Sequence, residues 1–200
     1  MYPIVYFKLT NRSTVIFLTR KGIRLIIRTS TNSSDIHVFT EVWLEKEYSI
    51  PSFEIDENDV IIDIGAHIGI FSVFASQFCK NGIILCYEPT KDNYSVLTDN
   101  VKNNSIKNIF CYNKAVSGKN QMMKFYLSKD DLAAHSLYKK SEEWLEVESI
   151  TIKEIFDNNK LEKCDFLKMD CEGAEYEILM TLPENYFAKI NKICLEYHNM

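Results

Sequence analysis

The first part of the chain contains short runs of alternating character that are typical of β-strands. Two β-rich runs at residues 15–19 and 23–29 flank Arg20-Lys21-Gly22, which predicts a β-hairpin. Ser33-Ser34-Asp35 then supplies N-cap residues, and the apolar positions that follow lie on one side of a helix to about residue 46. We therefore predict a hairpin and a helix at the N-terminus.

Beyond residue 57 the pattern changes to short apolar runs that alternate with amphipathic stretches. The apolar runs predict strands at residues 60–64, 83–87, 109–112, 164–169 and 193–197. The intervening stretches predict helices at residues 68–78, after Pro89, at 152–156 and at 173–181.

This alternation predicts the fold class. Runs that are apolar throughout are typical of strands covered on both faces, and strand–helix alternation implies a parallel sheet with right-handed crossovers. We therefore predict an α/β fold with a Rossmann-like, doubly wound, mostly parallel sheet in residues 58–200, and an N-terminal hairpin-and-helix extension over residues 1–57. Residues 122–127 alternate like a further strand, and the polar residues 130–141 are predicted to form a loop over the active site.

Composition and charge narrow the choice of partners. The 200 residues are 46% hydrophobic, enough for one sizeable core, and the net charge of −5 disfavours a nucleic-acid partner. Residues 1–30 nevertheless carry basic side chains and no acidic ones, namely Lys8, Arg12, Arg20, Lys21, Arg24 and Arg28. Such a surface could meet an anionic substrate or a lipid headgroup, but interleaved apolar residues favour a solvated hairpin.

Cysteine usage and hydropathy predict a cytoplasmic protein without a membrane span. The six cysteines form no C-x-x-C pair, and no signal peptide opens the chain, so we expect reduced thiols. The most apolar stretch, residues 60–78, contains Asp63 and His67 and is a poor membrane span.

Polar residues stand at every predicted strand end. Ligands of open parallel sheets bind beyond the carboxyl ends of the strands, where the strand order reverses. The residues at these ends are Asp63, Gly65, Gly69, Glu88, Asn113, Asp170, Glu172, Glu196 and His198.

The segment from Asp63 to Gly69 reads as a glycine-containing turn between a strand and a helix. Glycine permits positive φ, and the helix N-terminus offers free N–H groups to a ligand. His67 and Ile70 stand where a dinucleotide fingerprint needs glycine, whereas the amino-acid end of S-adenosylmethionine tolerates side chains there and could use Asp63 as a partner for its ammonium. Alternatively, the glycines only pack a helix on a strand. Glu88, about twenty residues further on, stands where an acid accepts hydrogen bonds from ribose hydroxyls.

These residues lie within stretches that resemble the FkbM-type methyltransferases. The matching stretches are SDIHVFTEVWLEKEY, VIIDIGAHIGIFSVFAS, CYEPTKDNYSVLTDN, YNKAVS, DFLKMDCEGAEYEIL and ICLEYH, which occur in the order of the family. The resemblance implies a class I methyltransferase fold, S-adenosylmethionine as the cofactor, and O-methylation of a hydroxyl on a sugar, glycolipid or other small molecule. It places Asp63, Gly65, Ala66, Gly69, Glu88, Asn113 and Asp170 in the cofactor site.

The sequence departs from the family at two places. The family usually has Asn where this chain has His67, which we also assign to the cofactor site. The chain ends at Met200, directly after the last predicted strand, whereas the class I fold normally continues with a helix and an antiparallel strand pair. We expect that the chain is truncated here; the alternative is that the N-terminal hairpin supplies other edge strands.

The candidate catalytic residues are Asp170, Glu172 and His198, because each is polar and stands at a central strand end. Asp170 could serve the cofactor instead, and His198 titrates near neutrality, which suits a general base. Glu175 is expected to face solvent on its helix. No metal is predicted, since Asp170, Glu172 and Glu196 lack a clear ligand spacing. The competing interpretations are a nicotinamide-dependent oxidoreductase and a non-catalytic binding module; the sequence leaves the oligomeric state open.

Overall fold

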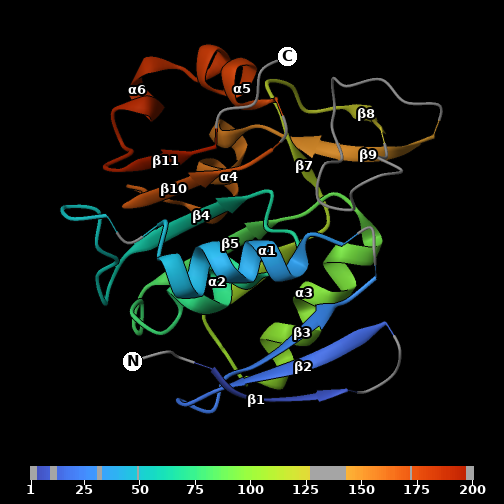
Figure 1. Ribbon diagram of the computed structural model, residues 1–200. Helices are drawn as coiled ribbons and strands as arrows, with labels where there is room; N and C mark the ends of the chain where they lie inside the picture. The colour runs from blue at the N-terminus through green and yellow to red at the C-terminus, as the bar shows by residue number, and fades with distance from the viewer. Residues whose placement is uncertain are drawn as a thin grey trace.

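A parallel five-stranded sheet forms the centre of the computed structural model, which describes residues 4–9, 13–30, 33–48, 50–126, 143–171 and 173–196 (Figure 1). The strands are β4 (Val60–Ile64), β5 (Ile83–Tyr87), β6 (Ile109–Tyr112), β10 (Phe166–Met169) and β11 (Ile193–Leu195). Their order is β11-β10-β4-β5-β6, so the direction of winding reverses between β4 and β10. The predicted doubly wound parallel sheet is confirmed, and the first strand pairs with the strand that ends at Met169.

The strands are apolar on both faces because helices cover both faces. Along β4, Ile61 belongs to one hydrophobic cluster and Ile62 to the other, and Ile84 and Leu85 divide in the same way along β5. The first cluster contains α2 (Ile70–Ala75) and packs against α3 (Lys91–Asn103), and the second contains α4 (Ile152–Asn159) and α5 (Glu175–Thr181). A short helix α6 (Glu184–Phe187) follows α5.

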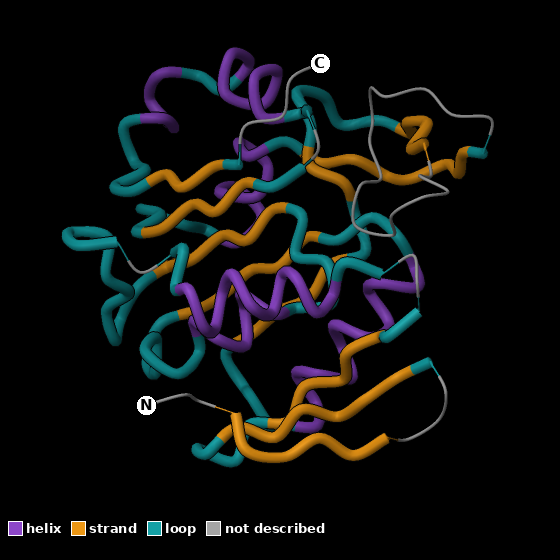
Figure 2. The backbone as a smooth tube through the Cα atoms, in the orientation of Figure 1, coloured by secondary structure: helices purple, strands orange, loops and turns teal. Residues whose placement is uncertain are grey.

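The N-terminal strands form a separate antiparallel sheet. The hairpin of β2 (Thr14–Thr19) and β3 (Arg24–Arg28) is confirmed, and β1 (Ile4–Leu9) adds a third strand that the sequence analysis did not predict. Figures 1 and 2 show this sheet beside α3, on the far side of that helix from the central strands. The Asn100 side chain joins the two layers, because its amide accepts from Ile26 N and donates to the carbonyls of Ile26 and Ile68.

The predicted N-terminal helix is divided into two types of helical turn. The α-helix α1 (Asp35–Phe39) continues into the π-helical segment η1 (Thr40–Glu45), which ends at Lys46 with positive φ. Within η1, the Trp43 indole N–H lies 3.3 Å from the carbonyl oxygen of Ile70, and its ring packs edge-on against Phe74. The segment is thereby attached to α2, immediately beside the glycine turn.

A third, smaller sheet is built from strands that follow β6 in the chain. It pairs β9 (Trp144–Ile150) with β7 (Ala115–Val116) and β8 (Met122–Tyr126). The strand β8 matches the prediction, but β9 was missed, although residues 144–148 alternate with a period of two. The predicted loop at 130–141 lies outside the described residues.

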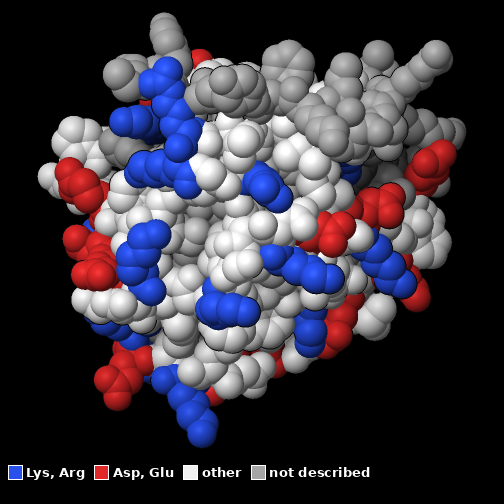
Figure 3. Space-filling view, turned by 90° about the horizontal axis from the view of Figure 1, so that it is seen from below, with Lys and Arg blue, Asp and Glu red and all other residues white. Residues whose placement is uncertain are grey.

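The basic N-terminal residues divide between surface and interior. Arg20, Lys21 and Arg24 are exposed, as the solvated-hairpin interpretation predicts, whereas Arg28 forms an ion pair with Asp35. Seen from below, Lys and Arg side chains are spread across the face of the molecule, with Asp and Glu toward its sides (Figure 3). The six cysteines are free. No helix in the described parts of the chain has the length and apolar character needed to cross a membrane.

Candidate functional site

A cavity opens at the carboxyl ends of β4, β5 and β10, where the strand order reverses. Its volume is about 800 Å³ including the open mouth. Residues from η1 and from α1 form one wall, and the small sheet contributes another through Ala115, Val116 and Phe125. The polar lining residues are Tyr48, His67, Glu88, Asn93, Lys168 and Asp170.

Positive φ and close contacts explain the two glycines of the predicted turn. Gly65 has φ +72°, and a Cβ atom there would lie 1.7 Å from the backbone carbonyl oxygen of Asp170. Gly69 has φ +83°, and a Cβ atom there would lie 2.5 Å from Leu97 of α3. Gly65 and Ala66 also line the cavity, so the turn serves packing and the cavity together.

Asp63 is buried behind the turn. Its carboxylate accepts from the Ser72 hydroxyl and lies 3.3 Å from the ammonium of Lys168. Lys168 also donates to the Gly65 carbonyl at 2.9 Å and lies 3.6 Å from Asp170. These carboxylates raise the pKa of Lys168 against the opposing effect of burial, so the ammonium stays charged.

Glu88 projects from the end of β5 into a ring of donors. Its carboxylate accepts from the backbone N–H groups of His67 and Thr90, from the Thr90 hydroxyl and, at 3.3 Å, from Asn93. Burial raises the pKa of Glu88, although these hydrogen bonds oppose the shift. Asn113 holds the same segment from behind, because its amide donates to the carbonyls of Glu88 and Pro89, both at 2.9 Å.

Asp170 lies beside the glycine turn, as predicted, and its N–H donates to the Ile64 carbonyl at 3.1 Å. Glu175 does not face solvent, contrary to the sequence interpretation. Its two carboxylate oxygens accept from the N–H groups of Cys171 and Gly173, both at 2.9 Å, so the side chain turns back to hold the segment after β10. The other two catalytic candidates, Glu172 and His198, lie outside the described residues.

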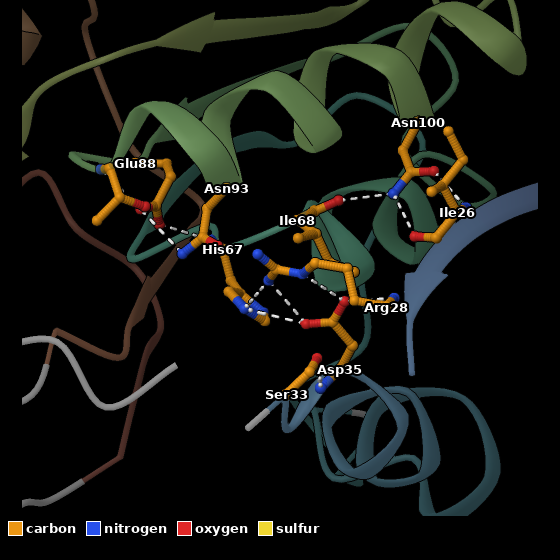
Figure 4. A network of polar contacts seen from close by, with 10 residues as sticks. Ile26, Arg28, Ser33, Asp35, His67, Ile68, Glu88, Asn93 and Asn100 are labelled. Carbon is orange, nitrogen blue, oxygen red and sulfur yellow. Dashed lines mark hydrogen bonds and ion pairs between the residues drawn. The ribbon is translucent and has the colours of Figure 1, made fainter. Parts of the chain in front are cut away.

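The N-terminal sheet reaches the cavity through a buried polar network (Figure 4). Asp35 accepts from Arg28 Nε at 2.9 Å and from Arg28 Nη2 at 2.8 Å, and the same Nη2 lies 2.9 Å from Nε2 of His67. Burial lowers the pKa of His67 to about 4, so the ring is neutral at pH 7. Among the described residues, Nδ1 of this ring is buried without a hydrogen-bond partner.

The predicted cofactor residues occupy two positions relative to the cavity. Gly65, Ala66, His67, Glu88 and Asp170 line it, whereas the positions of Asp63, Gly69 and Asn113 are explained by contacts that support the lining residues. The sequence analysis missed Lys168, although a lysine within an apolar strand was a signal for a buried ion pair.

Arg28, Asp35 and Asn93 were also missed, because ordinary surface residues have the same local pattern. Within the described part of the chain, no group of three or more His, Cys, Asp or Glu residues is arranged to hold a metal.

Comparisons with known proteins identify the family. Residues 63–199 match the methyltransferase FkbM domain. The chain is 25% identical over 191 residues to the methyltransferase sdnD of Sordaria araneosa, covering 80% of this chain and 73% of that protein. It is also 25% identical over 146 residues to the hexuronic acid methyltransferase AglP of Haloferax volcanii, covering 72% of this chain and 58% of that protein.

The comparison of structures finds the crystal structure of a methyltransferase FkbM from Methylobacillus flagellatus KT. The two are 15% identical with a TM-score of 0.49, and the match covers 72% of this chain and 32% of that one. Because the matched family domain spans most of the chain and contains the whole glycine turn, the chain belongs to the FkbM family of S-adenosylmethionine-dependent methyltransferases.

Proposed function

We propose that this chain methylates a hydroxyl group of a sugar, glycolipid or other small molecule, with S-adenosylmethionine bound in the cavity at the switch point. The observation that carries the proposal is the buried Glu88 carboxylate, which is held at the cavity wall by the backbone N–H of His67 in the glycine turn. The bound cofactor supplies an electrophilic methyl group on its sulfonium.

The lining residues fit the parts of this cofactor. The carboxylate of Glu88 suits the two ribose hydroxyls, and the apolar surface of Pro89, Val116 and Phe125 suits the adenine ring. The amino-acid end carries both charges of a zwitterion, and the cavity beside the turn is lined by both Lys168 and Asp170. Asp63 then contributes indirectly, because it does not line the cavity and its carboxylate contacts Ser72 and Lys168.

Proton removal from the acceptor is assigned to the segment after β10 or to the chain beyond β11. Asp170 lines the cavity with a side chain that is 28% exposed, so it can reach both cofactor and acceptor. Glu172 and His198 remain the other candidates. In single-turnover experiments we expect Asp170→Asn to lower methyl transfer severely and His198→Gln to lower it by ~10²-fold or more. Parent rates in His198→Gln would leave the role to the carboxylates at 170 and 172.

The acceptor class is supported by the relatives. The name of the Haloferax volcanii relative describes a methyltransferase that acts on a hexuronic acid, which is a sugar bearing hydroxyl groups. We propose a carbohydrate or related small molecule as the acceptor and a cytoplasmic location, with residues 1–57 as an extension of the cofactor-binding domain in residues 58–200.

Calorimetric titration of the chain with S-adenosylhomocysteine, S-adenosylmethionine and NAD tests the proposal. We expect both adenosyl compounds to bind and NAD not to bind. Binding of NAD instead would indicate an oxidoreductase, and binding of none of the three would indicate a binding module without cofactor chemistry.

A further inference from the structure

Two residues of the N-terminal extension, Arg28 and Asp35, contact the ring of His67 in the glycine turn. The sequence separates Arg28 from His67 by 39 positions, yet their nitrogen atoms lie 2.9 Å apart (Figure 4). The side chains of Arg28, Asp35 and His67 are 14%, 0% and 12% exposed, so water competes little for these contacts. The extension is therefore part of the wall of the cofactor site.

The contact with Arg28 determines which nitrogen of His67 carries the proton. Arg28 Nη2 has two hydrogens and no lone pair, and one hydrogen is directed to Asp35 Oδ1 at 2.8 Å. The other faces Nε2 of His67, which must accept it and so cannot carry a proton. A neutral imidazole then has its proton on Nδ1. The Asp35 oxygen at 3.3 Å from Nε2 is the weaker contact, and it is already occupied by Arg28.

Nδ1–H of His67 is consequently a buried donor on a residue that lines the cavity, and no described residue accepts from it. A buried donor of this kind gains from a ligand acceptor. On the proposed binding mode the ribose hydroxyls face Glu88 and the adenine faces apolar residues, so the cofactor carboxylate is the remaining strong acceptor.

We propose that Arg28 and Asp35 are positioning residues that hold His67 in its Nδ1–H tautomer, and that this N–H donates a hydrogen bond to the carboxylate of the bound cofactor. This inference rests on the proposed function for the identity of the ligand. The part that concerns the tautomer of His67 involves the protein alone and is tested without any ligand.

The tautomer is measured by long-range ¹H–¹⁵N correlation spectra of the ligand-free chain at pH 7.5. The chain has four histidines, and the His67 signals are identified as those missing from His67→Ala. We expect the proton on Nδ1 and an unprotonated Nε2. Replacing the pair together, as Arg28→Met with Asp35→Leu, avoids leaving a lone buried charge and should give a mixed tautomer signal. Protonation of Nε2 in the parent chain would overturn the proposal.

The ligand contact is tested with two probes that differ in the amino-acid part. S-adenosylhomocysteine has the carboxylate, and 5′-methylthioadenosine lacks it. We expect His67→Ala to weaken binding of S-adenosylhomocysteine by roughly 10- to 150-fold, because one hydrogen bond to a charged group is lost. The affinity for 5′-methylthioadenosine should change by no more than about twofold. His37→Asn is the matched control, because His37 on α1 is exposed and pairs with Glu41 on its own helical face.

The outcomes separate this inference from the proposed function. Equal weakening of both probes, or no weakening of either, would overturn the contact with the carboxylate. If the double variant does not fold, the tautomer of the parent chain and the His67→Ala titrations still decide. If the parent chain binds neither probe, the proposed function fails, while the tautomer measurement still tests the role of Arg28 and Asp35.

Discussion

Lys168 on β10 and Asp63 on β4 are register partners in the parallel sheet, and their charged atoms lie 3.3 Å apart. Their side chains are 5% and 0% exposed, so the pair is inside the protein rather than at its surface. Breaking a buried pair leaves an uncompensated charge, which costs far more than losing a solvated pair. Lys168 also donates a hydrogen bond to the Gly65 carbonyl, so this pair supports the glycine turn.

Lys168→Met should therefore lower the free energy of unfolding by about 3–5 kcal/mol, and adding Asp63→Asn should recover part of the loss. The matched control is Lys163→Met, which removes a lysine that is 56% exposed and should cost at most about 1 kcal/mol. Urea denaturation of the four chains measures the difference. Similar losses in Lys168→Met and Lys163→Met would show that the buried pair has no special importance.

Two glycines with positive φ allow the cost of backbone strain to be measured separately from the cost of a steric clash. At Gly22 a Cβ atom would meet nothing within 4 Å, so Gly22→Ala should cost only the left-handed strain of about 1–2 kcal/mol. At Gly65 the new methyl group would overlap the Asp170 carbonyl. We expect Gly65→Ala to lose ~4 kcal/mol or more and to lose cofactor binding. Equal costs at both positions would contradict the close approach of the two strand ends.

His67 makes stability depend on pH between about 4 and 6.5. Its pKa falls to about 4 on burial from an ordinary 6.5, with Asp35 and Asp170 opposing the shift and Arg28 and Lys168 adding to it. In this window the unfolded chain binds a proton that the folded chain does not, so stability falls as the pH falls. The loss approaches about 3 kcal/mol at pH 4 and then levels off for this group.

Urea denaturation at several pH values checks this dependence against His67→Asn, because asparagine does not titrate and tolerates positive φ. The variant should show a shallower fall below pH 6.5. The pKa of Asp35 is also lowered, chiefly by its hydrogen bond from Arg28 against burial, and its contribution is lost only at lower pH. Identical slopes in the two chains would show that His67 titrates normally.

Glu175 should affect the segment that carries Asp170. In Glu175→Gln one of the two backbone N–H groups would face an amide donor instead of an oxygen, which should cost about 1–3 kcal/mol and slow methyl transfer. The control is Glu184→Gln, because Glu184 is an exposed residue at the start of α6. Thermal denaturation and single-turnover rates measure the two effects. A fully active, equally stable Glu175→Gln would favour the original solvent-facing interpretation.

Glu88→Ala should weaken binding of S-adenosylhomocysteine by roughly 10- to 150-fold in a chain that still folds, as expected for one hydrogen-bonded carboxylate. Titration calorimetry gives the affinity, and Glu162→Ala, at an exposed position before β10, is the control. Unchanged affinity in a folded variant would remove the ribose assignment.

The sequence by itself determined the alternation of strands and helices around the central sheet, the glycine turn and the polar residues at the strand ends. These features are local: a strand apolar on both faces reads as a continuous apolar run, and Gly65 and Gly69 stand at fixed distances from it. The order of the strands in the sheet is that of the doubly wound fold that the alternation predicted, with β4 paired to β10.

Only the tertiary structure decided which polar residues act together. Lys168 reads in sequence as an exception within an apolar strand, and its partner Asp63 is 105 positions away. Arg28, Asp35 and His67 come from different elements that meet because Asn100 fixes the N-terminal sheet to α3. Burial also turned Glu175 inward to two backbone N–H groups, against its apparent place on an exposed helix face. Such contacts depend on distances in space and on exclusion of water, neither of which a local pattern of residues records.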